Sequence, residues 1–231
     1  MQTGCDLDTC FLCSHCLPEW KELVAIRKTT RVIRKGKAIF REGEPVEGLY
    51  FLIGGSAKVS TRWGGQKELI LRFAKAGQVL GHRGVGGSTY PISATALEDC
   101  RVCFIDNTFL ESTLRANPGF TYSLMQVYAA ELHAAEQRMR DLAHRDVKGR
   151  IALALLAMED FFGTNDTAHI ALPLSRQDIA SYAGSTYETV FKFFNELLTK
   201  GILASSGKSL RILDRGRLEA QVEAAAHPAS Q

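Results

Sequence analysis

The stretch L-S-R-Q-D-I-A-S-Y-A-G-S-T-Y-E-T-V-F-K-F-F-N-E-L-L-T-K-G-I-L, residues 174–203, contains two short helical patterns that meet at Gly184. Ser175 and Asp178 have the spacing of a capping box, with Asp in place of the usual Glu or Gln. The glycine permits a sharp turn between the helices. A second capping box is predicted to start at Ser185. Two capped helices around a glycine turn predict a helix-turn-helix.

The second helix of such a motif enters the major groove of DNA. Its buried face is predicted from the apolar spacing of Val190, Phe194, Leu197 and Leu198. The helix is predicted to end at Gly201. On its outward face, a carboxylate can accept from cytosine N4, a lysine can donate to guanine, and an aromatic edge can pack on a thymine methyl. A helical hairpin that only completes a core is the alternative. The residues predicted to contact DNA are Ser175, Arg176, Thr186, Tyr187, Glu188, Thr189, Phe191 and Lys192.

The pattern L-S-R-Q-D-I-A-x-Y-x-G-x-T-x-E-T-V in residues 174–190 resembles the helix-turn-helix signature of the superfamily of cyclic AMP receptor and fumarate–nitrate-reduction regulators (CRP/FNR). The resemblance implies double-stranded DNA with an inverted-repeat operator and RNA polymerase as partners. Where the family continues S-R, this chain has Phe191-Lys192. A phenyl ring replaces a hydroxyl and an ammonium replaces a guanidinium fork, so the family's operator cannot be carried over.

The composition is that of an ordinary globular protein, with 231 residues, 45% hydrophobic and 23% charged. The net charge of +3 is mild, but residues 175–217 alone hold seven Lys or Arg against four Asp or Glu, which fits contact with phosphates. No stretch approaches the roughly eighteen apolar residues of a membrane span. We therefore expect a cytoplasmic protein without a membrane partner. No nucleophile–base pair or phosphate loop indicates an enzyme.

Cysteines are concentrated in residues 5–16, C-D-L-D-T-C-F-L-C-S-H-C. The C-x2-C-x2-C run lets three thiolates converge on one centre, as in the bacterial ferredoxin-type iron–sulfur motif, whose fourth ligand comes from elsewhere. Cys100 and Cys103 are the remaining cysteines. Their separation of three places them on opposite faces of a strand, so only one can face a given cluster. The spacing alone does not choose between them.

The segment Val102-Cys103-Phe104-Ile105 resembles the V-C-x-I segment of the oxygen-sensing FNR branch, which also has an N-terminal cysteine cluster. The resemblance implies a [4Fe-4S] cluster on Cys10, Cys13, Cys16 and Cys103, and a protein that senses oxygen or a related oxidant such as nitric oxide. The branch has a longer gap before its third clustered cysteine. Cys5, Cys100 or His15 therefore remain alternative ligands.

Other chemistries fit the same thiols. A tetrathiolate zinc site needs the same ligands, although its pairs usually lie far apart in the sequence. A thiol–disulfide switch would use low-pKa thiols. Inert structural thiols would normally lie in apolar sequence, whereas these alternate with Asp, Ser and His. The corresponding alternative functions are a thiol- or small-molecule-responsive regulator without a cluster, and an iron–sulfur electron-transfer protein.

Short apolar runs separated by glycines fill the next part of the chain and predict a β-roll or barrel. Gly54-Gly55 and Gly64-Gly65 are predicted to mark hairpins. Residues 33–45 and 48–59 resemble the cyclic-nucleotide-binding jelly roll of the CRP/FNR superfamily. The predicted strands are Arg31–Ile33, Ala38–Phe40, Gly48–Ile53, Ala57–Thr61, Glu68–Phe73 and Cys100–Ile105.

The segment that corresponds to the family's nucleotide pocket is residues 81–94. His82 replaces the family's ribose-binding glutamate, and Tyr90-Pro91 replaces its phosphate-binding Arg-Ser or Arg-Thr. A buried phosphate would lose its bidentate guanidinium partner, and Arg83 lies on a different turn. We therefore expect no cyclic nucleotide. A haem ligand at His82 is a further alternative.

Asn117-Pro118 opens a long helical pattern that runs to about Asp141. Its apolar heptad positions predict a parallel two-stranded coiled coil and hence a homodimer, the alternative being a helix packed within one domain. The predicted seam carries no charge, so dimerisation should depend little on the cluster. The opposite face carries Glu131, Glu136, Arg138 and Arg140. The predicted interface residues are Met125, Tyr128, Leu132, Ala135, Met139 and Leu142.

The predicted fold class is α+β: a cyclic-nucleotide-binding-type β-roll (jelly roll), a long dimerisation helix and a winged helix-turn-helix whose wing is Ser205–Leu213. The predicted domains are a cysteine-rich segment (1–20), the β-roll (21–116), the dimerisation helix (117–145), the DNA-binding domain (146–220) and a tail (221–231).

Overall fold

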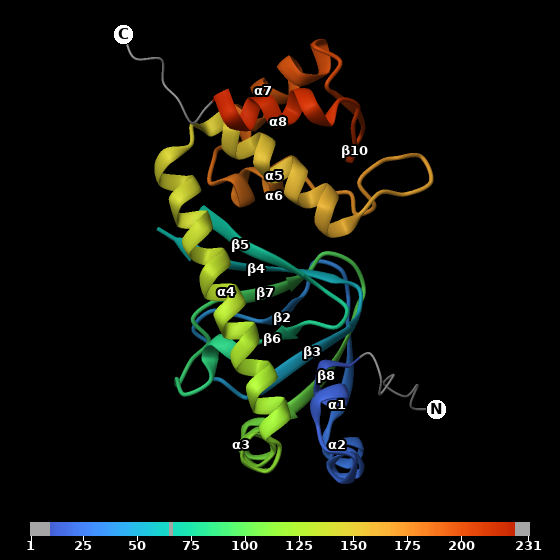
Figure 1. The fold of residues 1–231 in the computed structure, drawn as a ribbon, viewed down its shortest axis with the longest axis vertical. Coiled ribbons are helices and arrows are strands. Elements are labelled where there is room, and N and C mark those ends of the chain that lie inside the picture. Colours follow the sequence, from blue (N-terminus) through green and yellow to red (C-terminus); the bar gives the residue numbers. More distant parts are fainter. Residues whose placement is uncertain (1–9, 65–66, 225–231) are drawn as a thin grey trace. The chain divides into compact units, whose positions relative to one another are not determined.

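The computed structural model describes residues 10–64 and 67–224. The chain divides into two compact units, Met1–His133 and Ala134–Gln231. Two antiparallel sheets dominate the first unit, whereas the second is mainly helical (Figure 1). The predicted α+β class, with a β-roll, a long helix and a winged helix-turn-helix, is confirmed.

The β-roll is built from eight described strands. They are β1 (Thr29–Ile33), β2 (Ala38–Phe40), β3 (Gly48–Gly54), β4 (Ser56–Trp63), β5 (Lys67–Lys75), β6 (Val79–Leu80), β7 (Ser93–Ala96) and β8 (Cys100–Asp106). One sheet has the order β1-β8-β3-β6 and the other β2-β7-β4-β5, with antiparallel pairing throughout. The six predicted strands are present, and β6 and β7 were not predicted.

The two glycine pairs behave differently. Trp63 pairs with Lys67, so β4 and β5 form the antiparallel pair that a hairpin at Gly64-Gly65 requires, and Gly65 itself lies outside the described residues. The hairpin predicted at Gly54-Gly55 is wrong, because β3 and β4 belong to different sheets. The chain crosses there from one sheet to the other. Gly55 has φ +83°, and a Cβ atom would lie 2.6 Å from a backbone oxygen, so this crossing requires glycine.

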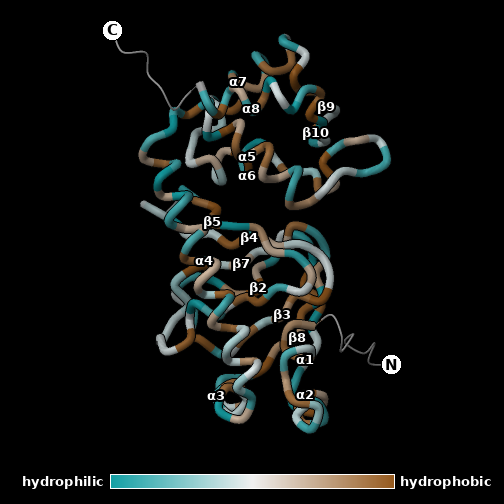
Figure 2. Tube along the Cα trace, viewed as in Figure 1, coloured by the Kyte–Doolittle hydropathy of each residue, from teal (hydrophilic) through white to brown (hydrophobic). Residues whose placement is uncertain are grey.

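Strands β3 and β8 of the β1-β8-β3-β6 sheet are largely buried on both faces, whereas β1 is exposed. Alternate residues of a strand point to opposite faces. Leu52 and Val102 face the core between the two sheets. Phe51 and Cys103 face a second apolar cluster, which the sheet shares with the N-terminal helices and with Phe120. In Figure 2, hydrophobic residues recur along β3 and β8.

Short helices flank this second cluster. Asp106 caps one of them by accepting a hydrogen bond from the backbone N–H of Phe109. The long helix begins at Pro118, as predicted, and extends three residues past Asp141 to His144. It contains the boundary between the two units. The helical elements are α1 (Phe11–His15), η1 (Pro18–Trp20), α2 (Lys21–Arg27), η2 (His82–Gly84), α3 (Asn107–Ala116) and α4 (Pro118–His144).

The second unit packs a helix-turn-helix against a central helix. This helix contacts the first helix of the motif and the last helix of the unit. Its buried residues include Ile151, Leu155 and Met158, which have the predicted helical spacing. Residues 221–224, assigned to the tail by the sequence, are helical. The elements are α5 (Val147–Phe162), α6 (Arg176–Ala183), α7 (Tyr187–Thr199), β9 (Leu203–Ser206), β10 (Ser209–Ile212) and α8 (Arg215–Ala224).

Candidate nucleic-acid interface and cysteine site

The turn between α6 and α7 forms as its local sequence requires. Ser175 and Asp178 make the predicted capping box, with both reciprocal hydrogen bonds present. Gly184 ends α6 in the left-handed conformation, with φ 61°. The second predicted capping box is wrong in register, because Thr186 rather than Ser185 caps α7. The Thr186 side chain accepts from the N–H at the third position of the helix, so a hydroxyl still caps it.

Helix α7 is amphipathic, with one feature that an ordinary surface helix lacks. Tyr187 and Phe191 lie on its outward face, 43% and 44% exposed. Their rings stack with centroids 6.3 Å apart. Residues separated by four positions lie on the same side of a helix, so the pair forms one exposed aromatic surface. The opposite face is buried and consists of Val190, Phe193, Phe194 and Leu197.

Cationic and polar side chains surround this aromatic surface. The Arg176 guanidinium lies 5.8 Å from the Phe191 ring centroid. A hollow between the starts of α6 and α7 and the β9–β10 hairpin is lined by Arg176, Gln177, Tyr187 and Lys208, among others. Lys208 follows Gly207 at the tip of that hairpin, so the predicted wing is present. This arrangement presents aromatic and cationic groups on one side of the second unit.

The residues predicted to contact DNA fall into two groups. Ser175 and Thr186 use their hydroxyls to cap helices, so their role in the structure is first to hold the motif together. Glu188 and Lys192 are exposed on α7. Hydrogen bonds from its own backbone N–H and from Thr186 lower the pKa of Glu188.

Helix α4 carries exposed apolar side chains at the predicted heptad positions. Met125, Leu132 and Met139 are 61%, 62% and 66% exposed, and Tyr128 is 37% exposed. Ala135 is also exposed, and Leu142 is half-buried. Residues spaced by seven along a helix define one stripe. The predicted seam is therefore an apolar stripe that residues 10–64 and 67–224 leave largely uncovered.

The structure brings together the four cysteines that the family resemblance implies as ligands. Cys10, Cys13, Cys16 and Cys103 are each at most 6% exposed and belong to one apolar cluster. Cys10 and Cys16 flank α1, and the spacing of three places the thiols on one side of this short helix. Cys103 lies on β8 opposite Phe51 of β3. Three N-terminal thiols and one distant thiol thus share a buried region.

The electrostatic surroundings of these thiols are mixed. Burial raises the pKa of Cys16 to about 11, with the nearby Cys10 adding to the effect and Lys21 opposing it. The Lys28 ammonium lies 3.7 Å from the Cys13 sulfur. Among the described residues, no three His, Cys, Asp or Glu side chains lie close enough together to hold one metal ion. The donor set suits a metal centre, although the thiols are grouped rather than drawn into one coordination sphere.

The alternative ligands lie elsewhere. Cys100 belongs to the core between the two sheets, and its thiol donates to the Ser56 carbonyl over 3.2 Å. The predicted opposite orientation of Cys100 and Cys103 is therefore confirmed. His15 is exposed, and its Nδ1 lies 2.8 Å from the Phe11 carbonyl oxygen. Cys5 lies outside the described residues.

The cysteine segment is attached to the start of α4. The Leu17 N–H donates to the Asn117 side chain over 2.9 Å, and the Phe11 and Phe120 rings lie 5.9 Å apart. Asn117 is fully buried, immediately before Pro118. The sequence marked Asn117-Pro118 only as the beginning of a helix. It contained no sign that the asparagine holds a segment one hundred residues away.

At its other end α4 contacts the helix-turn-helix. The Arg138 guanidinium lies 4.0 Å from the Tyr182 ring centroid and donates to the Tyr182 carbonyl. Arg150 on α5 donates to the Ala183 carbonyl over 3.1 Å. Arg138 was expected on the solvent face of the long helix, but it packs on α6 instead. Through these arginines, α4 and α5 fix the first helix of the motif.

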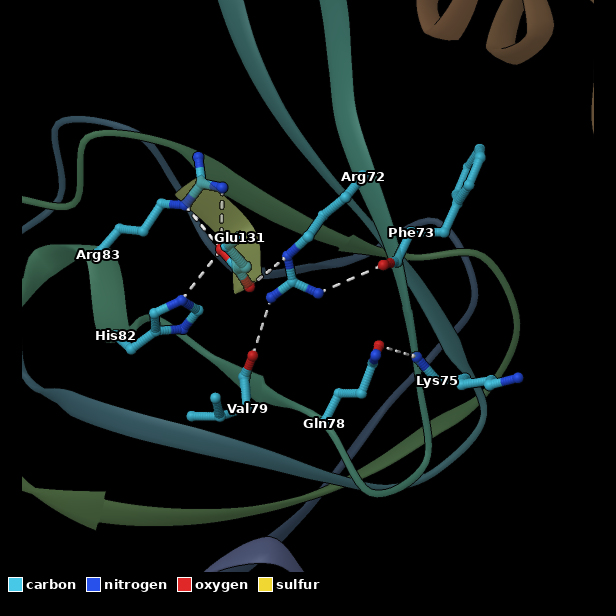
Figure 3. Close-up of polar contacts among 8 residues, drawn as sticks. All are labelled: Arg72, Phe73, Lys75, Gln78, Val79, His82, Arg83 and Glu131. Carbon is cyan, nitrogen blue, oxygen red and sulfur yellow. Dashed lines mark hydrogen bonds and ion pairs between the residues drawn. The ribbon is translucent and has the colours of Figure 1, made fainter. Parts of the chain in front are cut away.

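The segment that corresponds to the family's nucleotide pocket, residues 81–94, contacts α4. His82 is 1% exposed, and its carbonyl accepts a hydrogen bond from the Tyr128 hydroxyl. Glu131 lies against His82 and Arg83 rather than on the solvent face that its position predicted (Figure 3).

Within residues 10–64 and 67–224, no helix is both long and apolar enough to span a membrane.

Comparison with known proteins agrees with this architecture. The chain matches the cyclic nucleotide-binding domain family over residues 30–117 and the Crp-like helix-turn-helix domain family over residues 149–221. It is 30% identical to a CRP-like cAMP-activated global transcriptional regulator of Mycobacterium tuberculosis, covering 80% of this chain and 84% of that protein. It is 29% identical to the transcriptional activator protein FnrA of Stutzerimonas stutzeri, covering 89% of this chain and 87% of that protein.

The solved structure of FixK2 from Bradyrhizobium japonicum is 29% identical and superposes with a TM-score of 0.73, covering 88% of this chain and 99% of that one. The chain is a DNA-binding transcription regulator with a cyclic-nucleotide-binding-type β-roll. It belongs to the CRP/FNR superfamily, in its FNR-like branch.

Proposed function

We propose that this regulator senses oxygen, or a related oxidant such as nitric oxide, through a [4Fe-4S] cluster held by Cys10, Cys13, Cys16 and Cys103. The single observation that carries the proposal is the burial of these four thiols in one cluster, three from the N-terminal segment and one from β8. When bound, the cluster supplies an inorganic centre that oxidants destroy. Cys13 in α1, the flanking Cys10 and Cys16, and Cys103 on β8 would supply its thiolate ligands.

The signal is proposed to travel along α4. The cysteine segment holds the start of this helix through Asn117 and Phe120. The same helix carries the exposed apolar stripe of the proposed homodimer and, further on, Arg138 against α6. A change at the cysteines would therefore alter the packing of α4 before it alters the DNA-binding helix. Two copies joined along α4 would read an inverted repeat.

The aromatic surface of α7 is proposed to read thymine. Phe191 and Tyr187 expose flat apolar edges on the groove-facing side, where a thymine methyl offers the complementary apolar contact. Lys192 and Glu188 would read neighbouring guanine and cytosine. Because two relatives are named transcriptional activators, we also propose that the bound dimer contacts RNA polymerase.

The reading of thymine is tested on an operator selected from random duplexes. Replacing thymine by deoxyuracil removes only the methyl group. The wild-type protein should lose affinity at specific positions, by about 1 kcal/mol for each lost methyl contact. Phe191→Ser should bind the thymine and deoxyuracil duplexes equally. Equal binding of the two duplexes by the wild-type protein would contradict the proposal that the aromatic side chains of α7 contact thymine methyl groups.

The cluster is tested by purifying the full chain without oxygen and measuring its visible spectrum, iron and sulfide. Cys103→Ser should lose most of its iron, whereas the matched control Cys100→Ser should keep the wild-type content. The two cysteines lie on the same strand and are equally buried, so general damage to β8 would affect both variants. Colourless wild-type protein without iron, or equal iron loss in both variants, would contradict the proposal.

One observation favours a second candidate, a thiol switch without metal. The Lys28 ammonium lies 3.7 Å from the Cys13 sulfur, and a nearby cation stabilises a thiolate. Such a protein would be colourless and would form a disulfide on oxidation. Mass spectrometry after exposure to air, combined with the iron measurement, separates the two candidates.

A further inference from the structure

Three cationic or polar side chains of the β-roll converge on one carboxylate of α4. Arg72 lies on β5, His82 and Arg83 form part of η2, and Glu131 lies on α4 (Figure 3). Arg72 Nε is 2.8 Å from one carboxylate oxygen of Glu131. His82 Nε2 and Arg83 Nη2 are 3.1 and 2.9 Å from the other. Both oxygens of the carboxylate are therefore occupied.

This arrangement is more than a surface ion pair. The side chains of Glu131 and His82 are 15% and 2% exposed, and those of Arg72 and Arg83 are 20% and 27% exposed. Arg72 also donates to the Val79 carbonyl over 2.9 Å, which fixes its guanidinium in the β-roll. A carboxylate is costly to bury unless charges and hydrogen bonds compensate it. Here the β-roll supplies two guanidinium groups and an imidazole for one carboxylate.

The cations belong to the β-roll, whereas the anion comes from the helix beside it. The cationic set therefore has the composition of an anion-binding site: fixed guanidinium donors at a partly desolvated position. Among the described residues, His82 Nδ1 has no hydrogen-bond partner although it is buried. A single carboxylate thus leaves one buried nitrogen of the site without a partner.

We infer that Arg72, His82 and Arg83 form an anion-binding site of the β-roll and that the carboxylate of Glu131 is its built-in ligand. The external ligand class is a small oxyanion or carboxylate, which can enter only when Glu131 is withdrawn. The site lies in the segment where the sequence shows no residues for a cyclic nucleotide. The chain thus completes its own β-roll by supplying the anion from α4.

The built-in ligand also fixes α4. Tyr128, one turn before Glu131, donates its hydroxyl to the His82 carbonyl, so two residues of the same helix face hold η2. Leu132 of the proposed dimer stripe follows immediately. Together these contacts set the rotation of α4 about its axis, and with it the direction in which the stripe points.

The test is chemical rescue in the full chain. Glu131→Ala should lower the thermal midpoint by several degrees. Sodium acetate or sodium phosphate should restore part of the loss in a concentration-dependent way, and sodium chloride at equal ionic strength should restore less. The double variant Arg72→Ala/Glu131→Ala should show no anion-specific recovery. Glu136→Ala, which removes an exposed carboxylate from the same helix, should match the wild-type protein with every salt.

Equal stability of Glu131→Ala and the wild-type protein would overturn the inference, as would equal recovery with chloride and acetate. If Glu131→Ala does not fold, the isosteric Glu131→Gln variant gives the second measurement. Its amide hydrogens in residues 128–133 should exchange several-fold faster than those of the wild-type protein, and unchanged exchange would also overturn the inference. Neither measurement involves DNA or iron, so the inference and the proposed function can fail separately.

Discussion

Helix α4 is held to the β-roll unit at two places that differ in chemistry. Near its start, the contacts are a hydrogen bond between Leu17 and Asn117 and the aromatic packing of Phe11 on Phe120. Three turns later, the contacts are the charges around Glu131 and the hydroxyl of Tyr128. The first attachment contains the segment that carries the cysteines, whereas the second contains no thiol.

We expect the first attachment to respond to an oxidant and the second attachment to stay unchanged. If the proposed cluster is bound there, its loss would loosen the cysteine segment and with it the first attachment, because both share one apolar cluster. The second attachment does not depend on an external ligand, since Glu131 supplies the anion. An oxidant would therefore act on one end of a helix whose middle stays in place.

The largest effect is expected from Phe120→Ala. Phe120 is fully buried and packs against Phe11 and Phe51, so the change should cost about 3–5 kcal/mol of unfolding free energy. Urea denaturation of the metal-free protein measures the loss. The control Tyr122→Ala, at a position 62% exposed, should cost less than about 0.5 kcal/mol. Similar losses in the two variants would show that the packing of Phe120 does not hold the start of α4.

The second attachment should show a specific dependence on pH. Burial raises the pKa of Glu131, but the contact with His82 and the charges of Arg72 and Arg83 outweigh it and lower the pKa from 4.5 to about 2. A carboxyl with a lowered pKa in the folded state stabilises the protein above its unfolded pKa. That contribution is lost as the pH falls from about 4.5 to about 2.

The unfolding free energy of the wild-type protein should therefore fall by about 2 kcal/mol more than that of Glu131→Gln between about pH 6 and about pH 3. Urea denaturation at the two pH values measures the difference. Parallel losses in the two proteins would show that Glu131 is not held as an ion by Arg72 and Arg83.

A smaller effect is expected from Asn117→Ala. This change removes the acceptor of the Leu17 N–H and a buried side chain that also donates to the Thr113 carbonyl. It should cost about 1–3 kcal/mol. Hydrogen exchange at the Leu17 amide should accelerate, while exchange in residues 128–133 stays at the wild-type rate. Acceleration in both regions would mean that the two attachments are not independent.

The smallest effect is expected from Tyr128→Phe, which removes one hydroxyl and keeps the ring. The loss of the hydrogen bond to the His82 carbonyl should cost about 1 kcal/mol. Thermal denaturation measures it. Iron content should stay at the wild-type level in anoxic protein, and a loss of iron would contradict the separation of the two attachments.

Sequence reasoning succeeded where the determining interactions are local. The capping box of Ser175 and the left-handed Gly184 are both set by residues within one or two turns. The alternation along β8 separated Cys100 from Cys103 correctly, because the two-residue period of a strand needs no knowledge of its neighbours. Even so, the shift of the second cap to Thr186 shows that two adjacent hydroxyl residues cannot be ranked by pattern alone.

The predictions that failed or were missing depend on contacts between distant residues. The sequence Gly54-Gly55 predicts a hairpin. The pairing of β3 with β8 and of β4 with β7 shows instead that the chain changes sheets there. Glu131 fits a solvent-exposed heptad position. Its partners Arg72 and Arg83 lie 59 and 48 residues away in the sequence, and no local pattern connects them to it.

Hydrogen exchange of anoxically purified protein, before and after exposure to air, shows whether the two attachments of α4 respond separately to an oxidant. We expect exchange to accelerate in residues 117–124, beside the cysteine segment, and to stay unchanged in residues 128–133, where Glu131 is held. Equal acceleration in both segments, or no change in either while the iron is lost, would contradict this expectation.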